Sequence, residues 1–412
     1  MNRNIGLTIG NLKVNISLKC VLAYIYICRS SFLVFARQFS LSAIVGGAIL
    51  VSFFFILMVY TFLEYKNICW DGIILVILAA LFFYITIKIH PEYAYRYEDA
   101  IHDGHNSAKA VFHFGSAIYF YYIIRLFKNS EEELYNLYKA VSYTILFFDI
   151  WALYNRSAAY KMTFGYQMEM AAILFMMQFL RDKKKHCLIL SFFTIMLGVL
   201  YGSRACILGY VVFIAIYFMW KRRLNMRQLF IVILGIIAAL AYSSLTVMRA
   251  LYEFFASLGF KSRTLYYIAN GDILSGDQAR QKFIWPKLME NLKQMPIFKM
   301  YGAFGDRTLL SVKWVYAHNF IFEILLTFGF IIGGTFLVWM IIRFILIIRK
   351  KKDLGGLMTI VFGSFALCRL FFSSSFWMEH YFWGFVAMLV NCHVKKKYRI
   401  RLATQRLEKK TV

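Results

Sequence analysis

Proline and acidic residues are scarce in this chain. Its 412 residues include only 3 prolines, and 21 Asp and Glu stand against 47 Lys and Arg, which gives a formal net charge of +26. The seven cysteines are scattered and contain no CxxC pair, so their spacing indicates neither a disulfide framework nor a zinc site. No cleavable signal peptide is evident, and we find no internal repeat of the kind that marks many secondary transporters.

Apolar residues dominate the rest of the sequence. Hydrophobic side chains make up 61% of the chain and aromatic ones 19%, and apolar runs recur along its length. This composition predicts an all-α fold, a polytopic bundle of transmembrane helices in a lipid bilayer. The basic residues fall mostly in short clusters between the apolar runs, which carries topological information and argues against a nucleic-acid partner.

The lengths of the apolar runs, compared with the thickness of a bilayer, predict about twelve spans. Residues 1–247 are expected to hold nine of them, 248–317 to form a large extracytoplasmic loop with short helices, 318–394 to hold the C-terminal spans, and 395–412 to form a basic cytoplasmic tail. The spans are expected near residues 15–36, 39–63, 73–89, 107–127, 138–154, 165–180, 187–201, 205–220, 228–247, 328–348, 355–373 and 376–393.

Four basic clusters predict the orientation of these spans. All four fall on one side of the predicted topology, which the excess of Lys and Arg makes cytoplasmic, so both termini are cytoplasmic and the segment 248–317 faces outward. The first span carries Lys19 and Arg29 and is alternatively an amphipathic helix on the membrane surface, which would move the N-terminus outside. The clusters are Arg181–Lys185, Lys221–Arg223 with Arg227, Arg349–Lys352, and the tail from Lys395.

The outer segment is long, aromatic and basic. Roughly seventy residues separate the ninth and tenth expected spans, and loops of such length are usually functional or disordered. Thirteen Phe, Tyr and Trp side chains argue for short packed helices rather than disorder. Ten Lys or Arg against five Asp or Glu suit an anionic ligand such as a lipid-linked phosphate or pyrophosphate, and the alternative is contact with acidic lipid headgroups.

Two arginines are candidates for binding that anion, because a guanidinium holds phosphate oxygens in two-point contacts and keeps its charge. Arg280 precedes the apolar residues Phe283–Trp285, which could anchor a short helix, and Arg204 lies in a tight turn between two expected spans. For Arg204 the alternative is snorkelling to lipid headgroups. For Arg249, Arg263 and Arg307 we expect a solvated or lipid-headgroup role rather than a catalytic one. Arg249 and Arg263 are also candidate contacts to the substrate.

Ionisable residues also mark the start of the tenth span. His318 could accept a proton from a sugar hydroxyl near neutral pH, and Glu323 follows five residues later. Asn319 or His318 could equally cap the helix, a structural role. Within the spans, Glu169 and Arg369 lie toward the outer ends and could line a substrate cavity, or form a buried ion pair or an interfacial contact.

Four segments taken in order resemble the bacterial superfamily of O-antigen ligases and Wzy-type polysaccharide polymerases. The most specific is Ala317-His318-Asn319 leading to Glu323 and Gly329–Gly333, because family members carry H-N-x-x-x-[EQ] before a glycine-bearing span. The wider spacing from Ser275-Gly276 to Arg280 and the loose Gly302-Ala-Phe-Gly305 depart from the usual pattern. The other segments are Gly202–Arg204, Ser275–Trp285, and Pro296–Phe298 with Gly302 and Gly305.

The resemblance implies a glycosyltransferase of the bacterial cytoplasmic membrane that uses an undecaprenyl-pyrophosphate-linked glycan as donor. A polymerase joins it to a second lipid-linked repeat, and the stretch Tyr160–Tyr166 favours this over a ligase, which transfers the glycan to lipid A core or protein. A chain-length regulator and a flippase of the same pathway are expected partners. In these roles Arg204 and Arg280 would neutralise the pyrophosphate, and His318 would orient or deprotonate the attacking hydroxyl.

No metal or organic cofactor is expected. The first external loop lacks the acidic D-x-D or E-x-D motif that holds a divalent cation in many other membrane glycosyltransferases, and the ligand types between His90 and His105 fit no defined metal spacing. A lipid-linked oligosaccharide flippase or another transporter is the rival class. Such a carrier should show charged or glycine-broken spans in two matched halves, and none are apparent.

Overall fold

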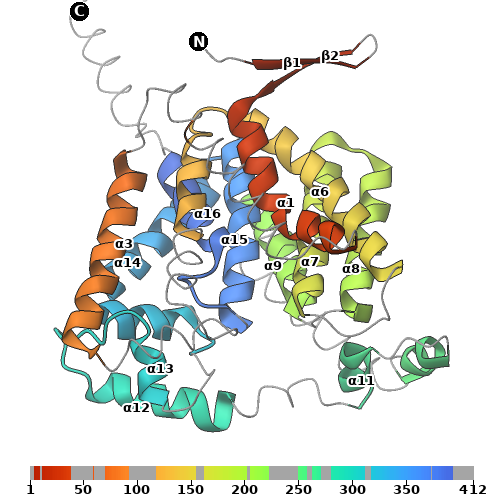
Figure 1. The fold of residues 1–412 in the computed structure, drawn as a ribbon. Coiled ribbons are helices and arrows are strands. Elements are labelled where there is room, and N and C mark those ends of the chain that lie inside the picture. The colour runs from red at the N-terminus through yellow and green to blue at the C-terminus, as the bar shows by residue number, and fades with distance from the viewer. Residues whose placement is uncertain are drawn as a thin grey trace, which may run out of the picture.

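The computed structural model describes twelve stretches of the chain, and they form a bundle of helices (Figure 1). Of the expected spans, 39–63 and 228–247 lie outside this part of the chain, apart from residue 59. The described residues are 4–9, 12–38, 59, 70–91, 117–154, 162–201, 205–221, 249–257, 262–270, 280–310, 317–372 and 374–392.

Helices lie within the described parts of the other ten expected spans, and short helices occur between residues 249 and 310. Two of these helices have no label and cover residues 117–125 and 249–257. The labelled ones are α1 (Leu18–Gln38), α3 (Trp70–Ile89), α6 (Glu131–Tyr154), α7 (Met162–Asp182), α8 (Lys185–Tyr201), α9 (Ala205–Trp220), α11 (Arg263–Ala269), α12 (Trp285–Gln294), α13 (Gly305–Leu310), α14 (Phe320–Lys350), α15 (Leu354–Phe372) and α16 (His380–Asn391).

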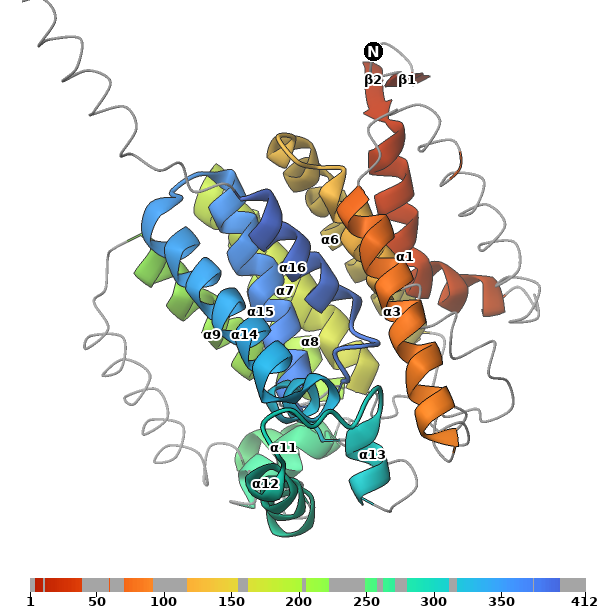
Figure 2. The ribbon, with the colours of Figure 1, turned by 90° about the vertical axis from the view of Figure 1, so that its left-hand side faces the viewer.

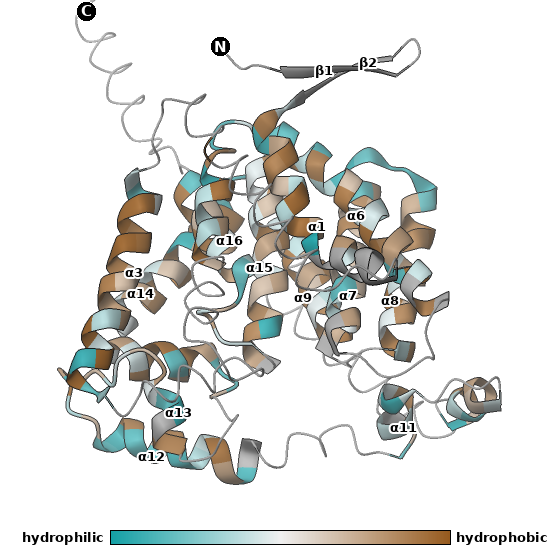
Figure 3. Cartoon of the chain, viewed as in Figure 1, coloured by the Kyte–Doolittle hydropathy of each residue, from teal (hydrophilic) through white to brown (hydrophobic). Residues whose placement is uncertain are grey.

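Within the described part of the chain, three helices are long and apolar enough to cross a membrane: Trp70–Ile89, Phe320–Lys350 and Leu354–Phe371. A few such helices indicate a membrane protein. Hydrophobic colours cover the bundle in Figure 3, whereas hydrophilic colours gather toward its ends.

The peripheral helices place small or polar residues inside and large apolar residues outside. The buried residues of α8 are Cys187, Ser191, Thr194 and Gly198, whereas large apolar residues of the same helix, such as Phe192, are exposed. Small residues allow helices to approach closely in a membrane, where lipid rather than water covers the outer apolar face. In α3 the same arrangement recurs at seven-residue spacing, with Gly72, Ala79 and Thr86 buried.

The centre of the bundle is formed by α15, α16 and α7, and Figure 1 shows α15 in the middle of the view. Most of α16 is buried, including Phe382, Phe385 and Leu389. Rings pack around it: Phe385 meets Phe344 of α14 edge to face at 5.1 Å between centroids. These aromatic contacts hold the central helices together, because ring pairs add to the stabilisation that apolar burial provides.

The expected first span is corrected at its start. Residues 15–17 belong to a β-strand, β2 (Leu12–Ser17), which pairs antiparallel with β1 (Asn4–Ile9) in a hairpin, so the described residues include a two-stranded sheet beside the helices. The helix α1 runs parallel to α6 along the bundle (Figure 2). Successive contacts join Tyr24 to Thr144, by a hydrogen bond of 2.6 Å, and Phe32 to Phe148, with ring centroids 5.6 Å apart.

Lys19, near the start of α1, is buried with only 2% of its surface exposed. Its ammonium group donates a hydrogen bond to Ser130 Oγ at 2.8 Å and lies 3.1 Å from Glu133 Oε1. A buried cation needs such partners, because transferring a charge from water into the protein costs several kcal/mol. Removing one partner of a buried ion pair destabilises a protein by about 3–5 kcal/mol. Lys19, whose charge weakened the prediction of a first span, therefore has an ionic partner in α6, Glu133.

The described basic residues Arg181–Lys185, Lys221 and Arg349–Lys352 lie at one end of the bundle. At that end Trp220 Nε1 donates to the carbonyl of Lys351 at 2.7 Å, Lys351 Nζ lies 3.7 Å from Glu131, and Arg181 binds Glu132 at 2.8 Å. The short helices α12 and α13 lie at the opposite end (Figure 1).

The expected span 328–348 belongs to a longer helix that begins at Phe320 and breaks at Gly329. Gly329 has φ 74° and ψ 174°, a conformation open to glycine, and a Cβ there would lie 2.7 Å from the carbonyl oxygen of Lys299. The carbonyls of Leu326 and Thr327 instead accept hydrogen bonds from the N–H groups of Tyr301 and Gly302, at 2.9 and 3.2 Å. The turn at 299–304 is thereby docked into the break.

Replacing Glu133 by Ala is expected to lower the free energy of unfolding by about 1–2 kcal/mol, because Lys19 keeps a buried charge while Glu133, 39% exposed, is partly screened by solvent. Thermal unfolding in detergent measures this change. The matched control is Glu132→Ala, which removes a carboxylate that is 62% exposed and should change the stability by less than about 0.5 kcal/mol.

The same contribution should depend on pH. Partial burial raises the pKa of Glu133, but hydrogen bonds from Ser17 and Lys19 outweigh it and hold the pKa below its usual range. The stabilisation is therefore complete above about pH 4.5 and is lost as the pH falls further. Equal acid sensitivity of the unmodified protein and Glu133→Ala between pH 5 and 3 would contradict this assignment.

Candidate functional site

The candidate site is built around the peptide groups of residues 317–319, which precede α14. Ala317 is fully buried, and its N–H donates to Asp306 Oδ2 of α13 at 2.9 Å. Its carbonyl accepts from Trp285 Nε1 of α12 at 3.1 Å. Two short helices thus hold both polar groups of one residue, and we call the set Trp285, Asp306, Ala317 and His318 the Ala317 clamp.

The clamp fixes the backbone next to His318. His318 has φ 47°, in the left-handed region where histidine is among the more tolerated non-glycine residues. Asn319 then reverses to an extended conformation and caps α14, its side chain accepting from the N–H groups of Ile321 and Phe322 at 3.0 and 3.4 Å. The capping alternative is therefore correct for Asn319, and His318 is the partly exposed residue held before the cap.

Local sequence explains where α12 of the clamp begins and which of its residues are buried. Trp285-Pro286 begins α12, where proline suits the first helical turn, and the helix buries Leu288 and Leu292 while its charged residues face outward. Those two leucines join a small apolar cluster with Leu310, Ala317 and Leu326. The cluster attaches the outer helices to the start of α14.

Asp306 is buried completely, and burial raises its pKa even though the Arg307 guanidinium and the Ala317 N–H favour the charged form. The expectation of a solvated Arg307 is wrong, because its side chain is 93% buried and its guanidinium carbon lies 5.0 Å from the centre of the Phe304 ring. Packing on an aromatic ring beside a carboxylate accounts for this burial.

Glu323 joins the start of α14 to the connection between α15 and α16. Only 1% of it is exposed, and it accepts hydrogen bonds from Ser375 Oγ and from the N–H of Phe376, the latter at 3.1 Å. The helical turn after Asn319 therefore directs Glu323 to a loop some fifty residues away in the sequence. Glu323 fixes the position of that loop because both of its hydrogen-bond donors, Ser375 Oγ and the Phe376 N–H, belong to the loop.

A buried ion pair lies at the end of the same loop. Arg369 Nε of α15 is 3.1 Å from Glu379 Oε2, with 24% and 1% of the two side chains exposed. The guanidinium carbon stands 5.0 Å from the Tyr166 ring centre and 5.7 Å from that of Tyr381. The buried-pair alternative for Arg369 is therefore correct, with Glu379 as its partner.

Glu379 also corrects the last expected span, 376–393. The helix α16 begins at His380, because the side chain of Glu379 caps it by accepting from the N–H of Tyr381 at 3.3 Å. Residues 376–378 form a turn before it. Glu379 thus combines a capping role with the ion pair.

Glu169 lies in the interior at the contact of α7, α9 and α15. It is 1% exposed, and its carboxylate occupies the space beside Gly209, where an added Cβ would fall 1.6 Å from Oε1. Cys368 Sγ is 3.0 Å from the same point, next to Arg369 in the chain. Glycine at position 209 is thus what leaves room for the carboxylate.

The structure brings some predicted residues together and leaves others apart. His318, Asn319 and Glu323 share the start of α14, and Glu323 connects them through residues 375–379 to Arg369. Arg249 and Arg263 are exposed on the segment beneath α8, and Figure 1 draws α11 away from α12 and α13. Arg263 donates to Tyr267 Oη at 3.2 Å.

Two predicted residues are less defined by the structure. Arg204 lies outside the described residues. Arg280 opens a π-helical turn, Arg280–Ile284, that leads directly into α12, five residues before the tryptophan of the clamp. Its backbone therefore continues directly into α12, the helix that binds the Ala317 carbonyl through Trp285.

Sequence reasoning missed Asp306, Ser375, Glu379 and Gly209. Asp306 followed a glycine in a motif that was used only for its glycines, and Glu379 was placed inside an expected span. The sequence did contain a signal for Glu379. An isolated carboxylate in an apolar run needs a charged partner, and Arg369 lies at the end of the preceding expected span.

Among the described residues there is no group of three or more His, Cys, Asp and Glu that could hold a metal ion. The ligand-rich stretch 92–105 lies outside them. What the described site offers is an imidazole at a helix start and a paired guanidinium, groups suited to proton transfer and to binding an anion.

No protein-family model, curated protein or solved structure matches the chain.

Replacing Asp306 by Ala is expected to cost about 1–3 kcal/mol of stability, because the N–H of the buried Ala317 loses its acceptor. Hydrogen exchange should accelerate in peptides that contain residue 317. Asp306→Asn is the matched control, since its amide oxygen can still accept this bond. Equal exchange rates in the two variants would contradict the clamp.

Replacing Gly209 by Ala is expected to destabilise the protein by about 1–3 kcal/mol or more, because the new methyl group overlaps Glu169. The added change Glu169→Ala should recover much of the loss in a double-mutant cycle of melting temperatures. Gly334→Ala is the control, since a Cβ there meets nothing within 4 Å and alanine favours the helix. Additive losses in the cycle would show that the two residues are not in contact.

Proposed function

We propose that the chain is a membrane glycosyltransferase that polymerises oligosaccharide repeat units carried on undecaprenyl pyrophosphate. In this proposal about twelve spans cross the bacterial cytoplasmic membrane, the basic end of the bundle faces the cytoplasm, and residues 248–317 face outward. The donor is then available to the site from the outer leaflet. The product is O-antigen, capsular or exopolysaccharide.

The observation that carries the proposal is the rigid placement of His318. The hydrogen bonds of Ala317 to Asp306 and Trp285 on one side, and the Asn319 cap on the other, hold its backbone in a left-handed conformation. A general base must be held in place to be effective, because proton transfer requires hydrogen-bond distance to the attacking hydroxyl. Histidine can take that proton near neutral pH.

Cationic groups in this part of the chain suit the pyrophosphate of the donor. Arg280 begins the π-helical turn that leads into α12, whose first residue is the clamp tryptophan, and Arg204 is proposed to supply a second guanidinium. Negative charge grows on the pyrophosphate as the glycosidic bond breaks, and fixed guanidinium groups stabilise it. Bond cleavage releases undecaprenyl pyrophosphate while the acceptor hydroxyl loses its proton to His318.

Arg369, Glu379 and Glu169 are proposed to form the inner wall of the lipid-glycan site. Arg369 keeps 24% of its surface exposed although it is paired with Glu379. Tyr166, the last residue of the polymerase-like stretch, packs on its guanidinium. The resemblance of the stretch Tyr160–Tyr166 to a polymerase segment supports a polymerase over a ligase, whose acceptor would be lipid A core or a protein.

Polymerisation by the purified protein from lipid-linked repeat units tests the proposal. His318→Ala and Arg280→Ala should each reduce the rate by about 100-fold or more, the scale associated with losing a general base or an oxyanion-stabilising group. Arg204→Lys should also impair turnover, because lysine keeps the charge but loses the two-point contact. Lys293→Gln on the exposed face of α12 is the control and should keep full activity.

A melting temperature measured for each variant separates loss of catalysis from loss of fold. Full polymerisation by His318→Ala would reject its assignment as the base. Transfer of the repeats to lipid A core, without growth of the chain, would assign the ligase activity instead.

A further inference from the structure

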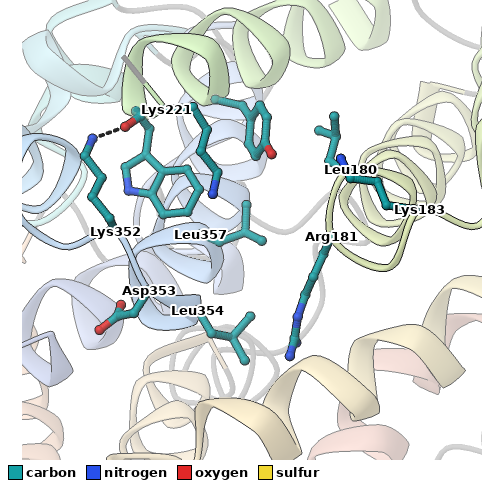
Figure 4. Close-up of a pocket in the computed structure, with 10 residues that line it drawn as sticks. Leu180, Arg181, Lys183, Lys221, Lys352, Asp353, Leu354 and Leu357 are labelled. Atoms are coloured by element: carbon teal, nitrogen blue, oxygen red, sulfur yellow. Dashed lines mark hydrogen bonds between the residues drawn. The ribbon is translucent and has the colours of Figure 1, made fainter. Parts of the chain in front are cut away.

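A pocket lies at the basic end of the bundle, at the end opposite the Ala317 clamp. It is a pocket of about 450 Å³ between the last turn of α7, the last turn of α9 and the first turn of α15 (Figure 4). Its lining residues are Leu180, Arg181, Lys183, Tyr217, Trp220, Lys221, Lys352, Asp353, Leu354 and Leu357.

Four cations and one carboxylate line the pocket, so it is strongly basic. Arg181 is paired with Glu132 at 2.8 Å, and Lys352 donates to the carbonyl of Trp220. Among the described residues, neither Lys183 nor Lys221 has a carboxylate partner. These two lysines, which come from the ends of different helices, are therefore available to an anion.

One wall of the pocket is apolar. Leu180, Leu354 and Leu357 line the pocket together with the rings of Tyr217 and Trp220, and the ammonium group of Lys221 is 4.5 Å from the centre of the Trp220 ring. Figure 4 shows Leu354 and Leu357 between Arg181 and the lysines Lys221 and Lys352, with Leu180 beside Lys183. A ligand that fits both walls has an anionic head and an apolar part.

The pocket also lies at the depth where such a ligand would be found. The three expected spans that border it end or begin at residues 180, 220 and 355, so the leucines belong to the span ends and the lysines to the residues just beyond. This is the boundary between acyl chains and headgroups. Basic pockets between helices on the cytoplasmic side are known sites for anionic lipids.

We propose that this pocket binds an anionic phospholipid, with its phosphate between Lys183 and Lys221 and an acyl chain along Leu180, Leu354 and Leu357. The same phosphate chemistry occurs in soluble anions, but these would leave the apolar wall uncovered. The bound lipid would connect α7, α9 and α15 at the end of the bundle remote from the clamp.

Lys183 has a geometry that allows a clean test. It ends α7 in the left-handed conformation, with φ 61°, and its N–H donates to the carbonyl of Phe179 at 3.0 Å. Asparagine tolerates this conformation, so Lys183→Asn removes the charge and keeps the backbone. The double variant Lys183→Asn with Lys221→Gln therefore removes both unpaired cations without strain.

The experiment measures the melting temperature of the full chain in a neutral detergent by tryptophan fluorescence. Added dioleoyl phosphatidylglycerol is compared with dioleoyl phosphatidylcholine and with glycerol 3-phosphate, which has the phosphate but no chains. The matched control variant is Lys184→Gln with Lys185→Gln, which removes two exposed charges of the same connection that do not line the pocket.

Phosphatidylglycerol should stabilise the unmodified protein and the control variant equally, and the other two additives should have little effect. In the pocket variant the lipid should bind about 30-fold more weakly, since each basic residue near an anionic surface contributes about a fivefold change in affinity. Equal stabilisation of both variants by the lipid would overturn the site. Equal effects of glycerol 3-phosphate and the lipid would overturn its assignment to a phospholipid.

Discussion

Burial of the Ala317 peptide group is the constraint on which the arrangement around His318 depends. An amide buried away from water must find hydrogen-bond partners inside the protein, because an unsatisfied group costs about 1–3 kcal/mol. At Ala317 those partners are two side chains from two short helices, so the positions of α12 and α13 are set by a residue that itself has no reactive group. The left-handed turn at His318 follows from this attachment.

A second dependence runs through carboxylates inside the bundle. Glu323 orders residues 375 and 376, and Glu379 at the end of the same connection caps α16 and binds Arg369. Each carboxylate satisfies backbone donors and thereby fixes a loop, which is an economical use of a group that is costly to bury. The start of α14, the end of α15 and the start of α16 are consequently held as one unit.

Periodicity and length in the sequence predicted the helices well because apolar runs are long and their ends carry charges. The basic clusters identified one end of the bundle, and Asn319 was one of two proposed caps. The helix boundaries were less accurate where the helix begins before the expected span, as in residues 320–327 of α14, or where the chain forms strands, as at residues 15–17. Hydropathy alone does not show where a cap starts a helix, as Asn319 does, or that a short segment forms a strand, as β2 does.

Pairings between distant residues could not be predicted from one sequence. Nothing local to Arg369 distinguishes Glu379 from Glu169 as its partner, and the burial of Arg307 depends on how α13 packs. The candidate site was therefore predicted in its components at residues 318–323, while the side chains that hold it, Trp285 and Asp306, were assigned only by their contacts.

The break at Gly329 divides α14 into two mechanical parts. The carbonyls at 326 and 327 bind the turn at 299–304 instead of continuing the helical ladder, so residues 320–328 are attached to a second part of the chain at the break. Any movement of this short segment would have to carry the docked turn with it and displace the loop that Glu323 binds at residues 375 and 376. The break thus separates a segment held by two other parts of the chain from a long, continuous apolar helix.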